Sequence, residues 1–229
     1  MSKYSKHLLV CGGTACKSHE SDHISEKLKK ELSKQGLEDT VQVIMTGCFG
    51  FCDKGPIVKV MPDNTFYTQV RPEDAEEIIE EHIVKGQRVE RLLQTDFKKK
   101  QLRIALRNCG LINPELIDEY IARDGYGALG EVLSNKTPEE VIAVMKSSGL
   151  RGRGGAGFPA GLKWDFARKN EADQKYVVCN ADEGDPGAFM DRSILEGDPH
   201  SVLGYGHSSL LHRGRYGIYI HQGRIPPGH

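Results

Sequence analysis

Four cysteines near the start of the chain stand in two spaced pairs that could hold a metal centre. Cys11 and Cys16 are separated by four residues, and Cys48 and Cys52 are separated by three. Glycines flank both pairs, so main-chain N–H groups can point at the sulfur atoms and tune a redox potential. Four thiolates suit zinc or an iron–sulfur cluster equally well by their softness.

The spacing of these cysteines helps to decide which centre they hold. Structural zinc sites favour two-residue gaps, and both gaps here are longer. Four ordinary buried thiols are a third interpretation, because free cysteine packs as a small hydrophobic residue. We favour a [2Fe–2S] cluster with these four cysteines as its metal ligands. Cys109 and Cys179 stand alone, and we expect them to be packing residues.

A glycine-rich stretch later in the chain could bind an anion. Residues 149–164 read G-L-R-G-R-G-G-A-G-F-P-A-G-L-K-W, and residues 180–187 read N-A-D-E-G-D-P-G. Glycine at this density weakens helices and strands but lets backbone N–H groups approach a ligand closely. Arginines, a lysine and a following helix favour an anionic ligand. Together with the cysteines, this indicates a ligand that works in electron transfer.

Other interpretations of these two loops fit less well. A nucleic-acid-binding arm would be expected to carry repeated RGG units, which this chain lacks. A dinucleotide-binding loop needs a preceding strand, whereas a helix is expected here, and no G-K-[ST] of a phosphate loop follows. Asp182, Glu183 and Asp185 could equally form a solvated turn or a weak cation site.

Length and charge limit the class of protein. The 229 residues suffice for one large domain or two small ones. The net charge of −1 implies no general attraction to nucleic acid or membrane, and no apolar run approaches a bilayer span. The first ten residues lack the pattern of a signal peptide. We therefore expect a cytoplasmic chain with no nucleic-acid partner and no direct membrane insertion, in a compartment where stable disulfides are rare.

Hydrophobic periodicity predicts a β-α-β-β-β-α unit that places the cysteine pairs after strands. A hairpin turn is expected at the Pro-Asp-Asn sequence of residues 62–64. The predicted strands and helices of this unit cover residues 7–10, 21–36, 41–45, 56–61, 65–70 and 72–85.

The second half of the chain carries fewer clear signals. A short helix is expected after Pro114, and Thr137, Pro138 and Glu140 predict a capped helix over residues 137–147. Residues 175–179 predict a buried strand that leads into the acidic loop. We expect four segments, namely a first domain over 1–86, a linker over 87–100, a partial domain over 101–203 and an aberrant tail over 204–229.

At this point the motifs resemble known families. C-x4-C and C-x3-C in a β-α-β-β-β-α unit resemble the thioredoxin-like [2Fe–2S] ferredoxins. The glycine loop, followed by C-N-A-D-E-G-D-P-G-A-F-M-D-R, resembles the FMN-binding region of the flavoprotein that oxidises NADH in respiratory complex I. Their fusion is similar to the flavin subunit of NAD(P)-linked and electron-bifurcating iron hydrogenases. The implied fold class is α/β, a ferredoxin domain followed by the N-terminal part of an FMN-binding α/β domain.

The resemblance implies roles for named residues, and it assigns no catalytic side chain. The metal ligands would be Cys11, Cys16, Cys48 and Cys52. Ala160 stands where many relatives have threonine, so one hydroxyl is missing. The residues that would surround the flavin and its phosphate are Arg153, Gly154, Gly155, Gly157, Phe158, Lys163, Asn180, Asp182 and Glu183.

The implied activity is that of an oxidoreductase subunit. NAD(P)H would give a hydride to FMN, and electrons would leave singly through iron–sulfur clusters to another redox subunit of a hydrogenase or complex I-like assembly. A [4Fe–4S] cluster is expected in full-length relatives only. A non-catalytic [2Fe–2S] electron carrier or docking module is the alternative, and a structural zinc protein is the third interpretation.

The resemblance stops after Leu203. The tail holds four of the nine histidines and no acidic residue, which could indicate metal binding. We favour a frameshift, because synonymous codons read one nucleotide later permit a sequence that resembles the helix and strand of the family. On this interpretation residues 1–86 fold and bind a cluster, whereas residues 101–229 bind FMN poorly or not at all.

Overall fold

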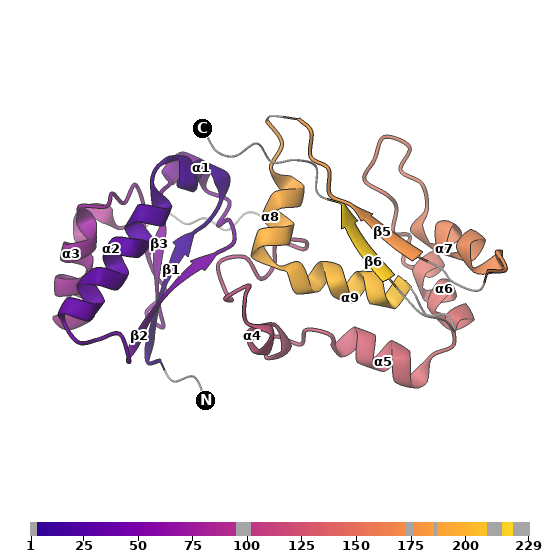
Figure 1. Cartoon of the computed structure of the whole chain (residues 1–229), viewed down its shortest axis with the longest axis horizontal. Coiled ribbons are helices and arrows are strands. Elements are labelled where there is room, and N and C mark those ends of the chain that lie inside the picture. The colour runs from indigo at the N-terminus through magenta and orange to yellow at the C-terminus, as the bar shows by residue number, and fades with distance from the viewer. Residues whose placement is uncertain (1–3, 95–101, 173–175, 186, 210–216, 222–229) are drawn as a thin grey trace. The chain divides into compact units, whose positions relative to one another are not determined.

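The computed structural model describes residues 4–94, 102–172, 176–185, 187–209 and 217–221 (Figure 1). The chain divides into two compact units. The first contains Met1–Tyr120 with Gly187–Pro199, and the second contains Ile121–Pro186 with His200–His229.

The first unit contains a four-stranded mixed sheet in the order β2-β1-β3-β4. Its strands are β1 (Lys6–Cys11), β2 (Val41–Thr46), β3 (Val58–Met61) and β4 (Thr65–Tyr67). β1 pairs in parallel with β2 and antiparallel with β3, and β3 and β4 form the predicted hairpin. Because β1 and β2 are parallel, their carboxyl ends lie at the same edge of the sheet. Each of these ends leads into one cysteine pair.

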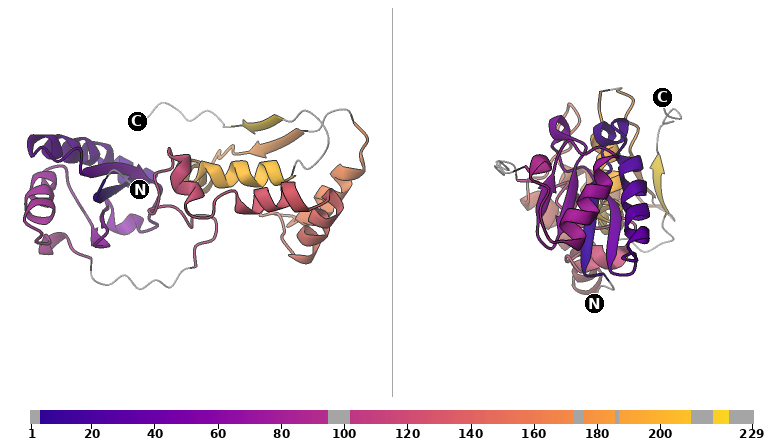
Figure 2. Two further views of the ribbon diagram at one scale, coloured as in Figure 1. Left: turned by 90° about the horizontal axis from the view of Figure 1, so that it is seen from below. Right: turned by 90° about the vertical axis from the view of Figure 1, so that its left-hand side faces the viewer.

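The two faces of this sheet bury different residues. On one face Leu8 and Val10 of β1 pack with Leu28 of α2 (Ser21–Lys34) and with the segment that begins at α3 (Asp74–Glu77). Figure 2 shows α2 and α3 beside each other over this face. Alternate residues of a strand point to opposite faces. The remaining face therefore receives Leu9 and Cys11, with Phe49 and Ile57.

The helix predicted over residues 72–85 differs from the expectation in its second half. After α3, residues Ile78–Val84 form a π-helix, η2. A π turn contains one more residue than an α turn. Its wider spacing brings Ile78, Ile79, His82 and Ile83 to the buried side together.

Part of the segment predicted as a linker packs against the β4 side of the sheet within the first unit. Val89 and Leu92 are buried, and a 3₁₀ turn, η3, covers Glu90–Leu92. The Thr68 N–H donates to the Leu92 carbonyl at 2.9 Å, and the Gln94 N–H donates to the Phe66 carbonyl at 3.0 Å. The rest of the predicted linker, from residue 95, lies outside the described residues.

A buried hydrogen-bonded chain fastens this segment to the hairpin. The Tyr67 hydroxyl accepts from the Val89 N–H at 3.0 Å and lies 2.8 Å from His82 Nδ1. His82 Nε2 lies 2.9 Å from Asp63 Oδ2 in the hairpin turn. With the hydroxyl donating to Nδ1, the imidazole is neutral and its Nε2–H donates to Asp63. Burial lowers the pKa of His82, and Asp63 offsets only part of that effect.

The remaining helices include α6, whose predicted cap is confirmed. Thr137 and Glu140 form a capping box with Pro138 in the first turn. Lys146 of α6 (Pro138–Ser147) pairs with Asp165 of α7 (Ala160–Lys169) at 2.9 Å. No helix of the described residues is long and apolar enough to cross a membrane. The helices not yet introduced are α1 (Thr14–Ser18), α4 (Ile117–Ile121), α5 (Gly127–Asn135), α8 (Met190–Gly197) and α9 (Pro199–Ser209), with the 3₁₀ turn η1 (Cys52–Lys54).

The strand predicted over residues 175–179 is present, but the prediction that it is buried was wrong. β5 (Tyr176–Asn180) pairs in parallel with β6 (Gly217–His221). The side chains of Tyr176 and Val178 are 55% and 65% exposed. An apolar strand is buried only where another layer covers it, and the described residues do not cover this face of β5. Of the tail assigned to a frameshift, residues 210–216 and 222–229 lie outside the described residues.

The His82 network predicts a pH dependence of stability. Because the pKa of His82 is lower in the folded chain than in the unfolded chain, the unfolded state binds more protons as pH falls through the ordinary histidine range. We expect the free energy of unfolding of the first unit to fall between pH 7 and about 5.5, above the range where carboxylates titrate. Urea unfolding followed by circular dichroism measures it. His82→Phe should flatten this dependence, and His23→Gln, at an exposed site, should not. Equal slopes in all three proteins would contradict the assignment.

Candidate functional site

The structure brings the four predicted cysteine ligands together at one edge of the sheet. Cys11 is the last residue of β1, Cys16 lies in α1, Cys48 follows β2, and Cys52 begins η1. The Cys11 thiol lies near enough to those of Cys16 and Cys48, and the Cys48 thiol near enough to that of Cys52, for each to shift the pKa of its neighbour. Cys11 and Cys16 are almost fully buried, Cys48 is half-buried and Cys52 is exposed. The thiols therefore extend from the interior to the surface.

These thiols strongly influence one another's ionisation. The pKa of Cys11 rises to about 11, through its hydrogen bond with Cys16 first and through burial as well. The pKa of Cys48 is raised well above its usual range by the Cys11 thiol and by burial. The pKa of Cys16 is lowered, because its thiolate accepts the hydrogen bond from Cys11. Four thiolates at this spacing repel one another, so a cationic centre is needed to hold all of them ionised.

The four thiols form a series in which each influences the next, from Cys16 through Cys11 and Cys48 to Cys52. A tetrahedral zinc would need four sulfurs around one point. In a [2Fe–2S] cluster the four thiolates are shared between two iron atoms. The linked thiol pairs therefore match the donor set of a cluster.

Glycines let the backbone close around the sulfur atoms. A Cβ added at Gly13 would lie 3.0 Å from Cys48 Sγ, and one at Gly55 would lie 2.7 Å from Cys16 Sγ. The Gly50 N–H donates to Cys48 Sγ at 3.2 Å. Such donors to cluster sulfurs set the reduction potential and fix the ligands. The residues present therefore fit a cluster on steric grounds as well as by ligand type.

The glycine loop is a closed turn that leads into α7. Arg151 and Pro159 form an isolated antiparallel bridge, and the Gly152 N–H donates to the Phe158 carbonyl at 2.8 Å. The Gly157 N–H donates to the Gly154 carbonyl at 3.0 Å. These bonds shape the loop. The two cations expected to bind the phosphate, Arg153 and Lys163, are both exposed to solvent.

At two positions of this loop, neither packing within the chain nor the backbone conformation requires glycine. A Cβ added at Gly154 or Gly155 would meet no atom within 4 Å, and neither residue has the left-handed backbone that Gly157 has at φ +54°. Arg153 lines an adjoining hollow of about 560 Å³ together with Tyr205. Open space beside small residues and a cation is what an anionic ligand needs for close approach.

The acidic loop that follows β5 contains a hydrogen bond of its own. Its Asp182 N–H donates to Asn180 Oδ1 at 2.9 Å, directly after β5. Of the nine expected flavin residues, only Arg153 lines the hollow beside the glycine loop. Tyr205 of α9 also lines it, and its ring lies 5.6 Å from that of Trp164 between centroids. Sequence reasoning missed Tyr205, because it lies in the tail that the sequence analysis set apart from the flavin region.

Two segments of the chain match known protein families. Residues 2–82 match the family described as thioredoxin-like [2Fe-2S] ferredoxin, and residues 145–211 match the Nuo51 FMN-binding domain. The chain joins a thioredoxin-like [2Fe–2S] ferredoxin domain to a Nuo51-type FMN-binding domain. The predicted resemblance and fold class are thereby confirmed.

Parts of the chain are similar to individual proteins of known sequence or structure. The NADP-reducing hydrogenase subunit HndC of Solidesulfovibrio fructosivorans is 67% identical over 109 residues, which are 48% of this chain and 22% of the relative. An NADH-quinone oxidoreductase subunit of Rhizobium meliloti is 49% identical over 100 residues, 44% of this chain and 24% of the relative. A crystallised thioredoxin-like [2Fe-2S] ferredoxin of Aquifex aeolicus is 34% identical and covers 40% of this chain and 97% of its own, with a TM-score of 0.37. The chain thus spans about a fifth of the length of these two curated relatives.

The close approach of Gly13 to the sulfurs can be tested by adding one methyl group. Gly13 has φ −63° and ψ 150°, which alanine adopts readily, so Gly13→Ala acts through contact with the side chains of Cys48 and Cys11. We expect cluster retention to weaken on the order of tenfold, as for other residues that orient metal ligands. Iron and sulfide analysis after dilution with a chelator measures this. Gly130→Ala, in open space on α5, is the control, and equal retention in both variants would contradict the close approach.

Proposed function

We propose that this chain is part of the flavin subunit of an NAD(P)H-linked oxidoreductase. The observation that carries the proposal is the meeting of four thiols at one sheet edge, in a chain that also matches an FMN-binding domain. Relatives named for hydrogenase and quinone reductase activity support the reaction class. The proposed segments are 1–86, 87–100, 101–203 and 204–229.

In this proposal the cysteine set holds the [2Fe–2S] cluster. The two thiols of the first pair come from the end of β1 and from α1, and those of the second pair flank the loop after β2. A bound cluster supplies one-electron transfer. The backbone at Gly13 and Gly55 passes close to the sulfurs and would hold them in position. The proposed ligands are Cys11, Cys16, Cys48 and Cys52.

The flavin region is proposed to bind FMN through backbone and cationic groups. N–H groups of Gly154, Gly155 and Gly157, with Arg153 and Lys163, would bind the phosphate end, because glycine permits close approach and the cations offset its charge. Bound FMN accepts a hydride from NAD(P)H and passes on single electrons. The proposed groups near the ring, ribityl chain and nicotinamide are Asn180, Asp182, Glu183 and Phe158.

The proposed partners follow from this electron route. Electrons that leave one at a time need another redox subunit, and both relatives compared above are named as subunits. We place the chain in the cytoplasm, because thiolates that bind iron must stay reduced and all six cysteines are free. We propose another redox subunit of a hydrogenase or complex I-like assembly as this partner.

Cluster analysis tests the cysteine assignment. Anaerobically prepared chain should contain two iron and two sulfide ions and show the visible bands of a [2Fe–2S] centre. Cys48→Ser should lose most of the iron, because serine is a poor ligand for this soft site, whereas Cys179→Ser should keep it. A colourless, zinc-loaded protein, or equal iron in the two variants, would refute the assignment.

Flavin titration tests the second half of the proposal. We expect FMN to bind this chain weakly, since only Arg153 of the nine proposed contacts lines the hollow. Arg153→Gln should weaken binding further by on the order of tenfold, as for loss of a charge-assisted hydrogen bond. Quenching of flavin fluorescence measures both affinities. Tight binding that Arg153→Gln leaves unchanged would contradict this role, and a cluster-bearing chain indifferent to flavin would favour the electron-carrier alternative.

A further inference from the structure

In the first unit, residues 102–113 lie against the loop that carries the second cysteine pair. Thr46, the last residue of β2, is 2% exposed and makes two hydrogen bonds to this segment. Its hydroxyl accepts from the Gly110 N–H at 3.0 Å and donates to the Ile112 carbonyl at 3.0 Å. Both the donor and the acceptor of the hydroxyl are therefore used. This anchor is two residues from Cys48.

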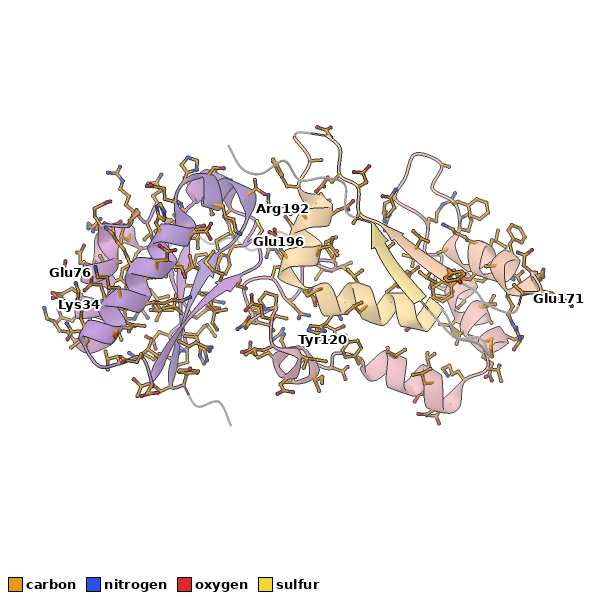
Figure 3. The ribbon with its side chains drawn as sticks, in the orientation of Figure 1. Lys34, Glu76, Tyr120, Glu171, Arg192 and Glu196 are labelled. Atoms are coloured by element: carbon orange, nitrogen blue, oxygen red, sulfur yellow. The ribbon has the colours of Figure 1, made fainter. Side chains whose placement is uncertain are left out.

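The same segment is fixed from its other side by α8, which carries the Arg192–Glu196 pair labelled in Figure 3. Asn108 Nδ2 donates to Asp198 Oδ2 at 2.7 Å, and both residues are almost fully buried. A Cβ at Gly47 would lie 2.6 Å from Gly197 Cα and 2.8 Å from Cys109 Sγ. No larger side chain fits at this contact.

Arg103 extends from this anchored segment to the cysteine loop. Its guanidinium donates to the carbonyl of Cys48 at 3.4 Å and also to the carbonyl of Phe49. Gly50 has φ +77°, and a Cβ there would collide with the guanidinium. The loop is thus shaped around a half-buried cation that binds the main chain of a proposed ligand.

We propose that Arg103 is a positioning residue that fixes the loop between Cys48 and Cys52 and raises the reduction potential of the cluster held there. The proposal rests on the cluster assignment of the proposed function. None of the sequence motifs points to this arginine, which lies 55 residues from Cys48.

Charge explains the direction of the effect. Reduction adds one negative charge to a cluster, and a fixed cation nearby stabilises the reduced form. A half-buried guanidinium is screened by salt less than an exposed one. Arginine suits this place better than lysine, because its planar fork can donate to two carbonyls at once.

Redox titration of the 229-residue chain tests the proposal, with the cluster signal followed by electron paramagnetic resonance. For Arg103→Gln we expect the ratio of reduced to oxidised cluster at a fixed potential to fall about tenfold, which is 59 mV for a one-electron couple. Arg103→Lys keeps the charge but lacks the planar fork, so the same ratio should fall about threefold. Arg107→Gln removes an exposed cation four residues away and should leave the ratio unchanged.

Iron and sulfide content separates the possible failures. A full cluster with the wild-type potential in Arg103→Gln would overturn the role of Arg103. If Arg103→Gln loses iron, the cluster potential of Arg103→Lys is measured instead. A potential shifted from the wild-type value supports the proposal, and an unshifted potential overturns it. Absence of iron and sulfide from the wild-type chain would contradict the proposed function itself.

Discussion

Parallel pairing of β1 with β2 is the constraint on which the cysteine site depends. It aligns the strands so that Cys11 pairs with Thr46, and the residues that follow both strands start from the same edge. A register shift of one residue would turn Cys11 toward the helix-covered face. Cysteines far apart in sequence therefore meet because the two strands end side by side in this register.

Successive residues of β1 point to opposite faces of the sheet and join two different clusters of buried residues. Leu8 and Val10 join the large core beneath α2, which supplies most of the buried apolar surface. Leu9 and Cys11 join the smaller cluster with Phe49, whose ring lies 5.0 Å from that of Phe66 between centroids. The core stabilises the domain whether or not a metal is bound, whereas the second cluster surrounds the sulfurs with apolar side chains. Such surroundings limit solvent access to a metal site and affect its potential.

The first domain could be predicted from sequence because its signals are local. The apolar runs of the strands and the hairpin turn at Asp63 each depend on residues that are close in sequence. The same holds for the capping box of α6 in the second unit. Other features depend on distant partners. The π turn at His82 reflects packing with Tyr67, and the exposure of β5 reflects which elements cover it. Arg103 carries no motif, and only the folded chain brings it to the cysteine loop.

The cysteine loops and the glycine loop differ in how closely the rest of the chain packs around them. The cysteine loops are closed by contacts within the chain, including the Gly50 bond to sulfur and the Thr46 anchor. Around Gly154 and Gly155, by contrast, the space is open. A preformed site loses little freedom on binding, whereas a loop that leaves space for its ligand gains order when the ligand binds. Binding of an anion would then also stabilise the folded second unit, because a ligand that binds only the native state shifts the folding equilibrium toward it.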